Sequence, residues 1–138
     1  MTAIRRGEAG DLAEIAAIQD GSPEAARWDV TGYLQYDLRV AILGGAVAGF
    51  LVSRRVDDAE SEILNLAVRA EWRRLGVARE LIRSLAAEAR GDLFLEVRES
   101  NLAARYLYNS MGFKEVSRRP EYYDFPPEAA IVMKFHSC

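Results

Sequence analysis

The stretch that most constrains the fold runs from Ser61 to Ala89, where an apolar segment is followed by a short polar loop and an amphipathic segment. The apolar segment, residues 63–68, is nearly continuous, which is typical of a strand covered on both faces. After the polar residues 69–74, apolar residues return at the spacing of a helix that buries one face. These are Val77, Leu81, Ile82, Leu85 and Ala89. The stretch therefore predicts a strand, a loop and a helix.

The predicted start of this helix combines small residues with arginines. Gly76 and Ala78 have almost no side chain, so an anion could approach the backbone closely. The first amides of a helix have no intrahelical partners, and the helix dipole adds partial positive charge there. Arg73, Arg74 and Arg79 would add guanidinium groups, which suit phosphate. The turn is a candidate phosphate or pyrophosphate site; an ordinary helix start with solvated arginines would explain the same residues.

This turn resembles the acetyl-CoA signature of the GNAT superfamily of N-acetyltransferases. Arg73-x-x-Gly76-x-Ala78 matches the signature Arg/Gln-x-x-Gly-x-Gly/Ala, directly after the strand segment Leu66-Ala67-Val68. The resemblance implies that acetyl-CoA is the co-substrate and that its pantetheine arm pairs with the backbone of that segment. It also implies that the CoA pyrophosphate is held by the backbone amides of Arg74, Leu75, Gly76, Val77, Ala78 and Arg79.

Composition places the chain among ordinary globular proteins. Its 138 residues are 50% hydrophobic and 28% charged, so we expect one domain, residues 1–138. A net charge of −3 argues against general nucleic-acid binding. The single cysteine, Cys138, can form no internal disulfide. No apolar run approaches the roughly 20 residues that span a bilayer, and the first residues lack the apolar core of a signal peptide. We therefore expect a cytoplasmic protein with no nucleic-acid or membrane partner.

The remaining elements follow from periodicity and turn residues. Besides the central strand we expect strands over residues 3–6, 39–43, 46–53, 93–97, 113–116 and 130–133. We expect helices over residues 11–18, 22–38, 77–89 and 101–111. Gly32 weakens the second helix, and Gly44-Gly45 predicts a tight hairpin. This order predicts an α/β domain, in which two strand–helix–strand passages favour parallel neighbouring strands.

The same order matches the GNAT fold over essentially the whole chain. That likeness implies a mixed, largely antiparallel central sheet flanked by helices. It also implies that the two central parallel strands, residues 63–68 and 93–97, splay apart and leave a cleft for the acetyl-thioester.

Glu96 and Tyr108 are the candidate catalytic residues. Acetyl transfer to an amine requires that the ammonium lose a proton and that the departing thiolate gain one. Glu96 lies in an apolar strand, where partial burial would suit it to accept a proton near neutral pH. The Tyr108 hydroxyl could protonate the thiolate. The residues alone equally allow a solvent-facing Glu96 at a sheet edge, a Tyr108 that only packs, and an Asn101 that only caps a helix.

A longer motif resembles the RimI-like N-acetyltransferases, which modify the N-terminal alanine of a ribosomal protein. It extends over residues 95–113 and reads LEVRESNLAARYLYNSMGF. The resemblance implies that Glu96 is the general base, Tyr108 the general acid and Asn101 a contact to the CoA arm. The segment RRPEYY, residues 118–123, is similar to the RimI-like tail and implies that Tyr122 and Tyr123 line the peptide entrance. Packing of the final hairpin explains either tyrosine equally well.

The implied activity is direct attack of a protein N-terminal α-amine on acetyl-CoA in a ternary complex. Two alternatives stay open: a lysine or small-molecule amine as the acceptor, and a CoA-binding partner protein without catalysis. The acceptor side departs from the family, because Glu128-Ala129-Ala130 stands where an acidic pair is usual. Only Trp28 remains of the usual Pro-Trp-Ser opening of the second helix. His136 is the only histidine, so we expect no metal site.

Overall fold

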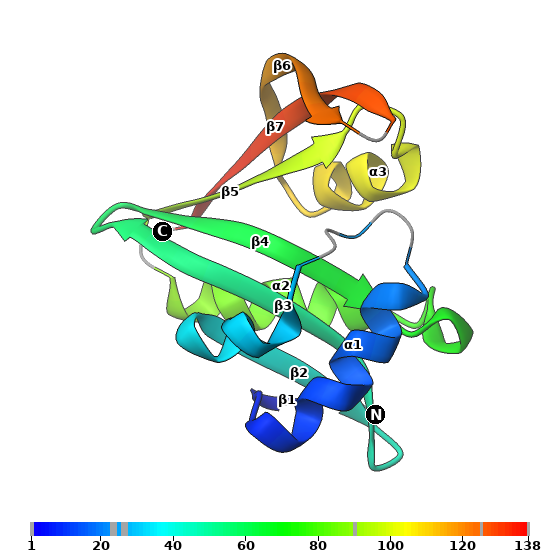
Figure 1. The fold of residues 1–138 in the computed structure, drawn as a ribbon. Helices are drawn as coiled ribbons and strands as arrows, with labels where there is room; N and C mark the ends of the chain where they lie inside the picture. Colours follow the sequence, from blue (N-terminus) through cyan, green and yellow to red (C-terminus); the bar gives the residue numbers. More distant parts are fainter. Residues whose placement is uncertain (1, 23–24, 26–27, 90, 125, 138) are drawn as a thin grey trace. The chain divides into compact units, whose positions relative to one another are not determined.

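The structure is a computed structural model, and it describes residues 2–22, 25, 28–89, 91–124 and 126–137 (Figure 1). The strands are β1 Ala3–Arg6, β2 Asp37–Leu43, β3 Ala46–Asp57, β4 Glu60–Val68, β5 Gly91–Arg98, β6 Lys114–Asp124 and β7 Pro127–Ser137. The helices are α1 Leu12–Asp20, α2 Val77–Glu88 and α3 Leu102–Ser110, with 3₁₀ turns η1 Ala9–Asp11, η2 Val30–Gln35 and η3 Ala70–Trp72. The expected order of strands and helices is confirmed, except for the second expected helix.

The strands pair in the order β1-β2-β3-β4-β5-β7-β6. The pairings β1–β2, β2–β3, β5–β7 and β6–β7 are antiparallel, whereas β4 and β5 are parallel. The parallel register joins residues 60–62 of β4 to residues 92–94 of β5. The mixed, largely antiparallel sheet is therefore confirmed. The prediction that β5 and β6 are also parallel neighbours is wrong, because β7 pairs with both of them and lies between them.

The chain forms two compact units, Met1–Arg54 with Ile63–Glu88 and Arg55–Glu62 with Ala89–Cys138. In the first unit, α1 and α2 lie on opposite faces of β2 and β3 (Figure 1). The α2 side chains that were expected to face inward are buried: Val77, Leu81, Ile82 and Leu85. The expectation that residues 63–68 are covered on both faces is only half right. Burial alternates along β4, and its fully buried face includes the polar residue Asn65.

The second expected helix, residues 22–38, is largely absent from the described residues. Only the short turn η2 is helical there, and Leu38 belongs to β2. The hydroxyl of Ser22, the expected cap of this helix, donates to the Ile18 carbonyl at the end of α1, at 2.7 Å. The expected first-turn residues Pro23 and Glu24 lie outside the described residues. The β-branched residues 30–31 and the glycine at 32 disfavour a longer helix.

The second unit consists of the β5-β7-β6 part of the sheet and α3. Asn101 caps α3, because its side-chain oxygen accepts a hydrogen bond from the Ala104 amide at 3.2 Å. Tyr108 on α3 packs on Phe113 with ring centroids 5.5 Å apart, and Phe113 packs on Phe135 at 5.3 Å. These rings form an aromatic stack that fixes α3 against β7.

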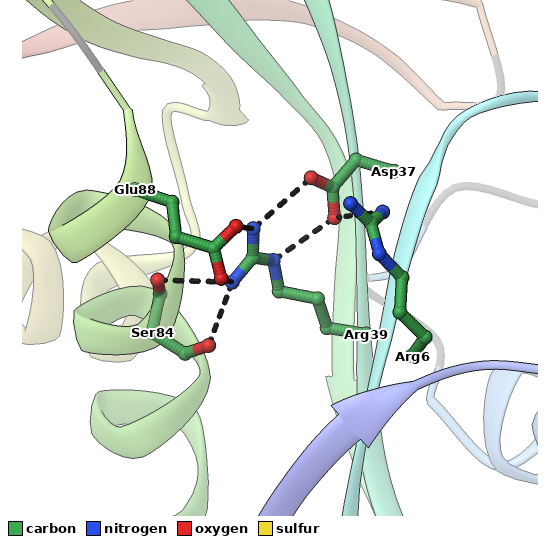
Figure 2. A network of polar contacts seen from close by, with 5 residues as sticks. All are labelled: Arg6, Asp37, Arg39, Ser84 and Glu88. Atoms are coloured by element: carbon green, nitrogen blue, oxygen red, sulfur yellow. Dashed lines mark hydrogen bonds and ion pairs between the residues drawn. The ribbon is translucent and has the colours of Figure 1, made fainter.

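A buried arginine fastens α2 to β2 in the first unit (Figure 2). The Arg39 side chain is 5% exposed and donates to both carboxylate oxygens of Asp37, at 2.9 and 3.0 Å. It also donates to both carboxylate oxygens of Glu88, at 3.1 Å each, and to the Ser84 carbonyl and hydroxyl. The network fixes the position of α2, the helix that begins at the candidate phosphate turn.

Candidate active site

The turn between β4 and α2 has the backbone shape that an anion site requires. Arg74 and Gly76 have positive φ angles, 67° and 83°, which reverse the chain into the helix. The Glu80 amide donates to the Gly76 carbonyl at 3.0 Å, so the intrahelical hydrogen bonds of α2 begin there. The amides of residues 77–79 therefore precede that ladder, as at any helix N-terminus. Leu75 is 63% exposed at the tip of the turn.

Arg73, the first residue of the signature, uses its side chain within the protein. Its Nε donates to the Val68 carbonyl at 3.1 Å, and its Nη2 donates to the Ser22 hydroxyl at 3.0 Å and the Gly21 carbonyl at 3.3 Å. The guanidinium thus joins the end of β4 to the end of α1. Arg73 is nevertheless an exposed residue, and its direct role in cofactor binding stays a prediction.

The backbone of residues 66–68 offers one acceptor and one donor along the edge of β4 that faces away from β3. The Arg69 amide donates to Ala48 of β3 at 2.7 Å, so the even-numbered residues direct their backbone groups to the other edge. On that edge, the Leu66 amide donates to the Asn65 side chain at 3.0 Å and the Val68 carbonyl accepts from Arg73. The acceptor and the donor on this edge are therefore the Leu66 carbonyl and the Val68 amide.

Three buried polar side chains support this part of β4, and the sequence analysis did not single them out. The Tyr33 hydroxyl donates to the Gln19 side-chain oxygen, and the Asn65 amide nitrogen lies 3.0 Å from both of those oxygens. Gln19 also donates to the Trp28 carbonyl at 2.7 Å. Burial raises the pKa of Tyr33, against the opposing hydrogen bond from Asn65. The network links α1, η2 and β4 in one hydrogen-bonded cluster.

Glu96 lies on β5 opposite Val132 of β7. Its side chain is only 12% exposed, so the interpretation of a solvent-facing residue at a sheet edge is wrong. Both carboxylate oxygens accept hydrogen bonds from Arg119, at 3.0 and 3.2 Å. The Glu96 carboxylate is therefore largely shielded from water and has an exposed cationic partner.

Tyr122 and Tyr123 lie close to Glu96 and to each other. Their rings meet edge to face with centroids 5.1 Å apart. Burial, followed by the negative charge of Glu96, raises the pKa of Tyr123 to about 12. The same two causes raise the pKa of Tyr122, which also hydrogen-bonds Glu96. The Arg119 guanidinium stacks 4.6 Å above the Tyr122 ring, and that of Arg98 lies 4.3 Å above the Tyr123 ring. The structure therefore brings together the predicted base and the predicted entrance tyrosines.

Tyr108 is buried, with 8% of its surface exposed. Burial, with a smaller contribution from Tyr123, raises the pKa of its phenol well above the usual value of about 10. The hydroxyl is therefore protonated at neutral pH, as an exposed phenol also is, and its raised pKa makes it the weaker acid of the two. Its ring also packs on Phe113, so the packing interpretation is correct as well; the catalytic role stays a prediction.

The acceptor-side residue Glu128 contacts the start of α3. Its carboxylate accepts a hydrogen bond from the Ser100 amide and pairs with Arg98 at 3.3 Å. The Ser100 hydrogen bonds lower the pKa of Glu128, and Arg98 adds to this effect. Glu128 thereby fixes the loop that leads to the capping residue Asn101. Of the two expected roles of Asn101, capping is confirmed and the CoA contact stays a prediction.

The sequence names the candidate residues, but it does not predict the side chains that contact them. In the sequence, Arg119 is only one residue of a tail motif. Its contact with Glu96 joins residues 23 positions apart, which no local pattern predicts. Asn65 was passed over inside an apolar run, although a lone amide in a buried strand is a signal for a polar contact.

Comparison with known proteins identifies the family. Residues 11–113 match the model of the acetyltransferase (GNAT) family. The chain belongs to the GNAT family. Its relatives include the [ribosomal protein bS18]-alanine N-acetyltransferase of Escherichia coli K12, 39% identical over 107 residues, which cover 73% of this chain and 70% of the relative. They also include the N-alpha-acetyltransferase RimI of Mycobacterium tuberculosis, 37% identical over 95 residues, which cover 66% and 60% of the two chains.

Structural similarity agrees with the sequence relationship. The crystal structure of the ribosomal-protein-S18-alanine N-acetyltransferase from E. coli superposes with a TM-score of 0.85 at 31% identity, over 99% of this chain and 94% of the other. As a GNAT protein, this chain is an acetyl-CoA-dependent N-acetyltransferase, and the RimI-like resemblance is confirmed.

No group of three or more His, Cys, Asp or Glu side chains among the described residues is placed to hold a metal ion. No helix in this part of the chain has the length and apolar character needed to cross a membrane.

Proposed function

We propose that this GNAT protein acetylates the N-terminal α-amine of a ribosomal protein that begins with alanine, with Glu96 as general base and Tyr108 as general acid. The relative at 39% identity is named for that substrate. The observation that carries the proposal is the surroundings of Glu96. It is a carboxylate with a 12% exposed side chain, beside Tyr122 and Tyr123, whose polar and aromatic groups suit the backbone of an incoming peptide.

Acetyl-CoA would bind along β4 and the turn before α2. The Leu66 carbonyl and the Val68 amide form an acceptor–donor pair on one strand edge, which suits the amide groups of the pantetheine arm. The amides of residues 74–79 would hold the pyrophosphate at the start of α2, where Gly76 supports the required backbone shape. Asn101 would contact the CoA arm from the start of α3.

The chemistry proceeds by direct attack of the amine. Glu96, directly or through a water molecule, accepts a proton from the substrate ammonium, and the neutral amine nitrogen attacks the thioester carbon. The Val68 amide stabilises the oxyanion as the new C–N bond forms. The C–S bond then breaks, and the Tyr108 hydroxyl gives its proton to the thiolate of CoA. The acylated nitrogen releases its second excess proton, which restores the Tyr108 hydroxyl and leaves a neutral amide. Tyr122 and Tyr123 line the peptide entrance.

Acceptor profiling tests this function. Release of CoA is measured with purified protein, acetyl-CoA and three acceptors. These are a lysine-free peptide that starts with alanine, the same peptide with a blocked N-terminus and one lysine added, and a polyamine. We expect turnover with the first acceptor only. Turnover with the blocked peptide or the polyamine instead would replace the proposed acceptor by a lysine or a small amine. Binding of acetyl-CoA without any turnover would support a non-catalytic partner protein.

The single domain over residues 1–138 and the cytoplasmic location expected from the sequence belong to the same proposal, as does the absence of nucleic-acid and membrane partners. They are consistent with a substrate that carries a free protein N-terminus.

A further inference from the structure

We propose that Arg119 is a displaceable counter-ion of Glu96, which occupies the site that the substrate ammonium takes when it binds. The inference rests on the proposed role of Glu96 as the base. Arg119 is the guanidinium that contacts both oxygens of the Glu96 carboxylate, at 3.0 and 3.2 Å. An α-ammonium that delivers its proton directly to this carboxylate, without a bridging water, must come within the same distance of the same oxygens. The two cations therefore compete for one site.

The exposures of the two partners differ, and the difference indicates which one moves. The Glu96 side chain is 12% exposed and lies on an inner strand, whereas Arg119 is 55% exposed and lies on β6, at the edge of the strand order. A carboxylate with this degree of burial is costly without a cationic partner. An exposed arginine loses little on leaving, since pairs of this kind change an equilibrium by at most about fivefold. Arg119 is thus the partner that can be exchanged.

Arg119 has a second contact that can hold it after the exchange. Its guanidinium lies 4.6 Å above the ring of Tyr122, which favours a cation on its face. A rotation of the terminal side-chain torsions would break the contact with Glu96 and keep the contact with Tyr122. The ring would then retain Arg119 beside the entrance while the ammonium binds Glu96.

This arrangement makes the site selective for cations. A neutral group cannot replace the charge of Arg119, because it would leave the Glu96 carboxylate unpaired in a largely desolvated position. An amine consequently enters protonated, takes over the ion pair and transfers one proton from its nitrogen to a Glu96 oxygen. Hydroxyl acceptors and blocked N-termini would be excluded at this step.

The neighbouring residue Arg118 provides a matched control. It is 54% exposed, lies on the same strand and donates to both carboxylate oxygens of Glu99, at 2.7 and 3.1 Å. Arg118 therefore matches Arg119 in exposure and also contacts both oxygens of one carboxylate, through Nε and Nη2 where Arg119 uses Nη1. The carboxylate that it contacts has no proposed role. Its substitution reports the general effect of removing one arginine from β6.

The test compares the KM and kcat for the alanine-starting peptide among the wild type, Arg119→Gln, Arg119→Lys and Arg118→Gln, at low and high salt. We expect Arg119→Gln to lower the peptide KM by about two- to fivefold with kcat nearly unchanged, because the competing cation is gone. The difference should shrink at high salt, where the exposed pair is screened. Arg119→Lys and Arg118→Gln should keep the wild-type KM. An unchanged KM in Arg119→Gln, or a loss of kcat on the order of tenfold, would overturn the inference in favour of an orienting role.

A binding measurement decides the inference even if no peptide reacts. Alaninamide is titrated into the protein while the guanidinium signals of Arg118 and Arg119 are followed by NMR. We expect the Arg119 signal to move toward its position in Glu96→Gln while the Arg118 signal stays in place. An Arg119 signal that does not shift when alaninamide is added would contradict the proposed displacement of Arg119 from Glu96. A failed acceptor profile with a responsive Arg119 signal would instead reject only the proposed substrate.

Discussion

At the scale of the single residue, Tyr108 combines two roles that one substitution can separate. Its ring packs on Phe113, and its hydroxyl has a pKa raised by burial. Tyr108→Phe keeps the ring and removes the proton donor. We therefore expect kcat to fall on the order of 10²-fold, with acetyl-CoA affinity retained. Tyr106 lies on the same helix and is 77% exposed, so Tyr106→Phe should leave kcat unchanged. Equal kcat values for the two variants would exclude Tyr108 as the acid.

The sequence offers candidates for the catalytic residues, but it does not predict the side chains that contact them. Glu96, Tyr108 and Asn101 fall within one continuous motif, so the resemblance of that motif to the RimI-like family is enough to propose their roles. The contacts of Arg73 with Ser22 and of Arg119 with Glu96 join segments 51 and 23 positions apart. Such contacts depend on how the strands are ordered, which periodicity along one segment cannot reveal.

At the scale of the element, Arg39 joins α2 to β2, and its two carboxylate partners differ in exposure. The Asp37 side chain is 25% exposed, whereas that of Glu88 is 65% exposed. Removing Asp37 deprives the buried Arg39 guanidinium of the carboxylate partner that is better shielded from water. We expect Asp37→Ala to lower the free energy of unfolding by about 1.5–3 kcal/mol. Glu88→Ala should cost less than about 1 kcal/mol, since water screens that contact. Urea unfolding of both variants measures the two losses of stability. A larger loss in Glu88→Ala than in Asp37→Ala would contradict this interpretation.

The elements themselves show where local reasoning works and where it fails. The hairpin at Gly44 and Gly45 is confirmed, with positive φ angles of 57° and 79° at the two glycines. Helix α2 is confirmed because its apolar spacing coincides with its buried face. A proline and a cap residue predict one helix over residues 22–38, which Gly32 weakens, yet Asp29 begins only the short turn η2. The position of β7 between β5 and β6 depends on long-range pairing that no local signal contains.

At the scale of the whole molecule, buried phenols set the alkaline limit of stability. Burial raises the pKa values of Tyr33, Tyr108 and Tyr123 in the folded state. Above pH of about 10 the unfolded chain loses these protons while the folded chain retains them. Folded protein then binds more protons than unfolded protein, so the free energy of unfolding falls as pH rises.

Each retained phenol proton contributes about 1 kcal/mol of destabilisation per pH unit above that point. Thermal melts between neutral pH and the alkaline range measure the effect. We expect a steady loss of Tm beyond pH of about 10, which Tyr108→Phe reduces in part. A Tm that stays level through this range would show that the phenols ionise without penalty.

The measurement that most directly tests the account is single-turnover acetyl transfer by Glu96→Gln with acetyl-CoA already bound. Glutamine keeps the shape of the side chain but cannot accept the proton. We predict a rate loss on the order of 10²- to 10⁴-fold with unchanged acetyl-CoA affinity. The control Glu99→Gln removes an exposed carboxylate that pairs with Arg118, and it should retain the wild-type rate. A Glu96→Gln rate within about threefold of wild type would show that Glu96 is not the base.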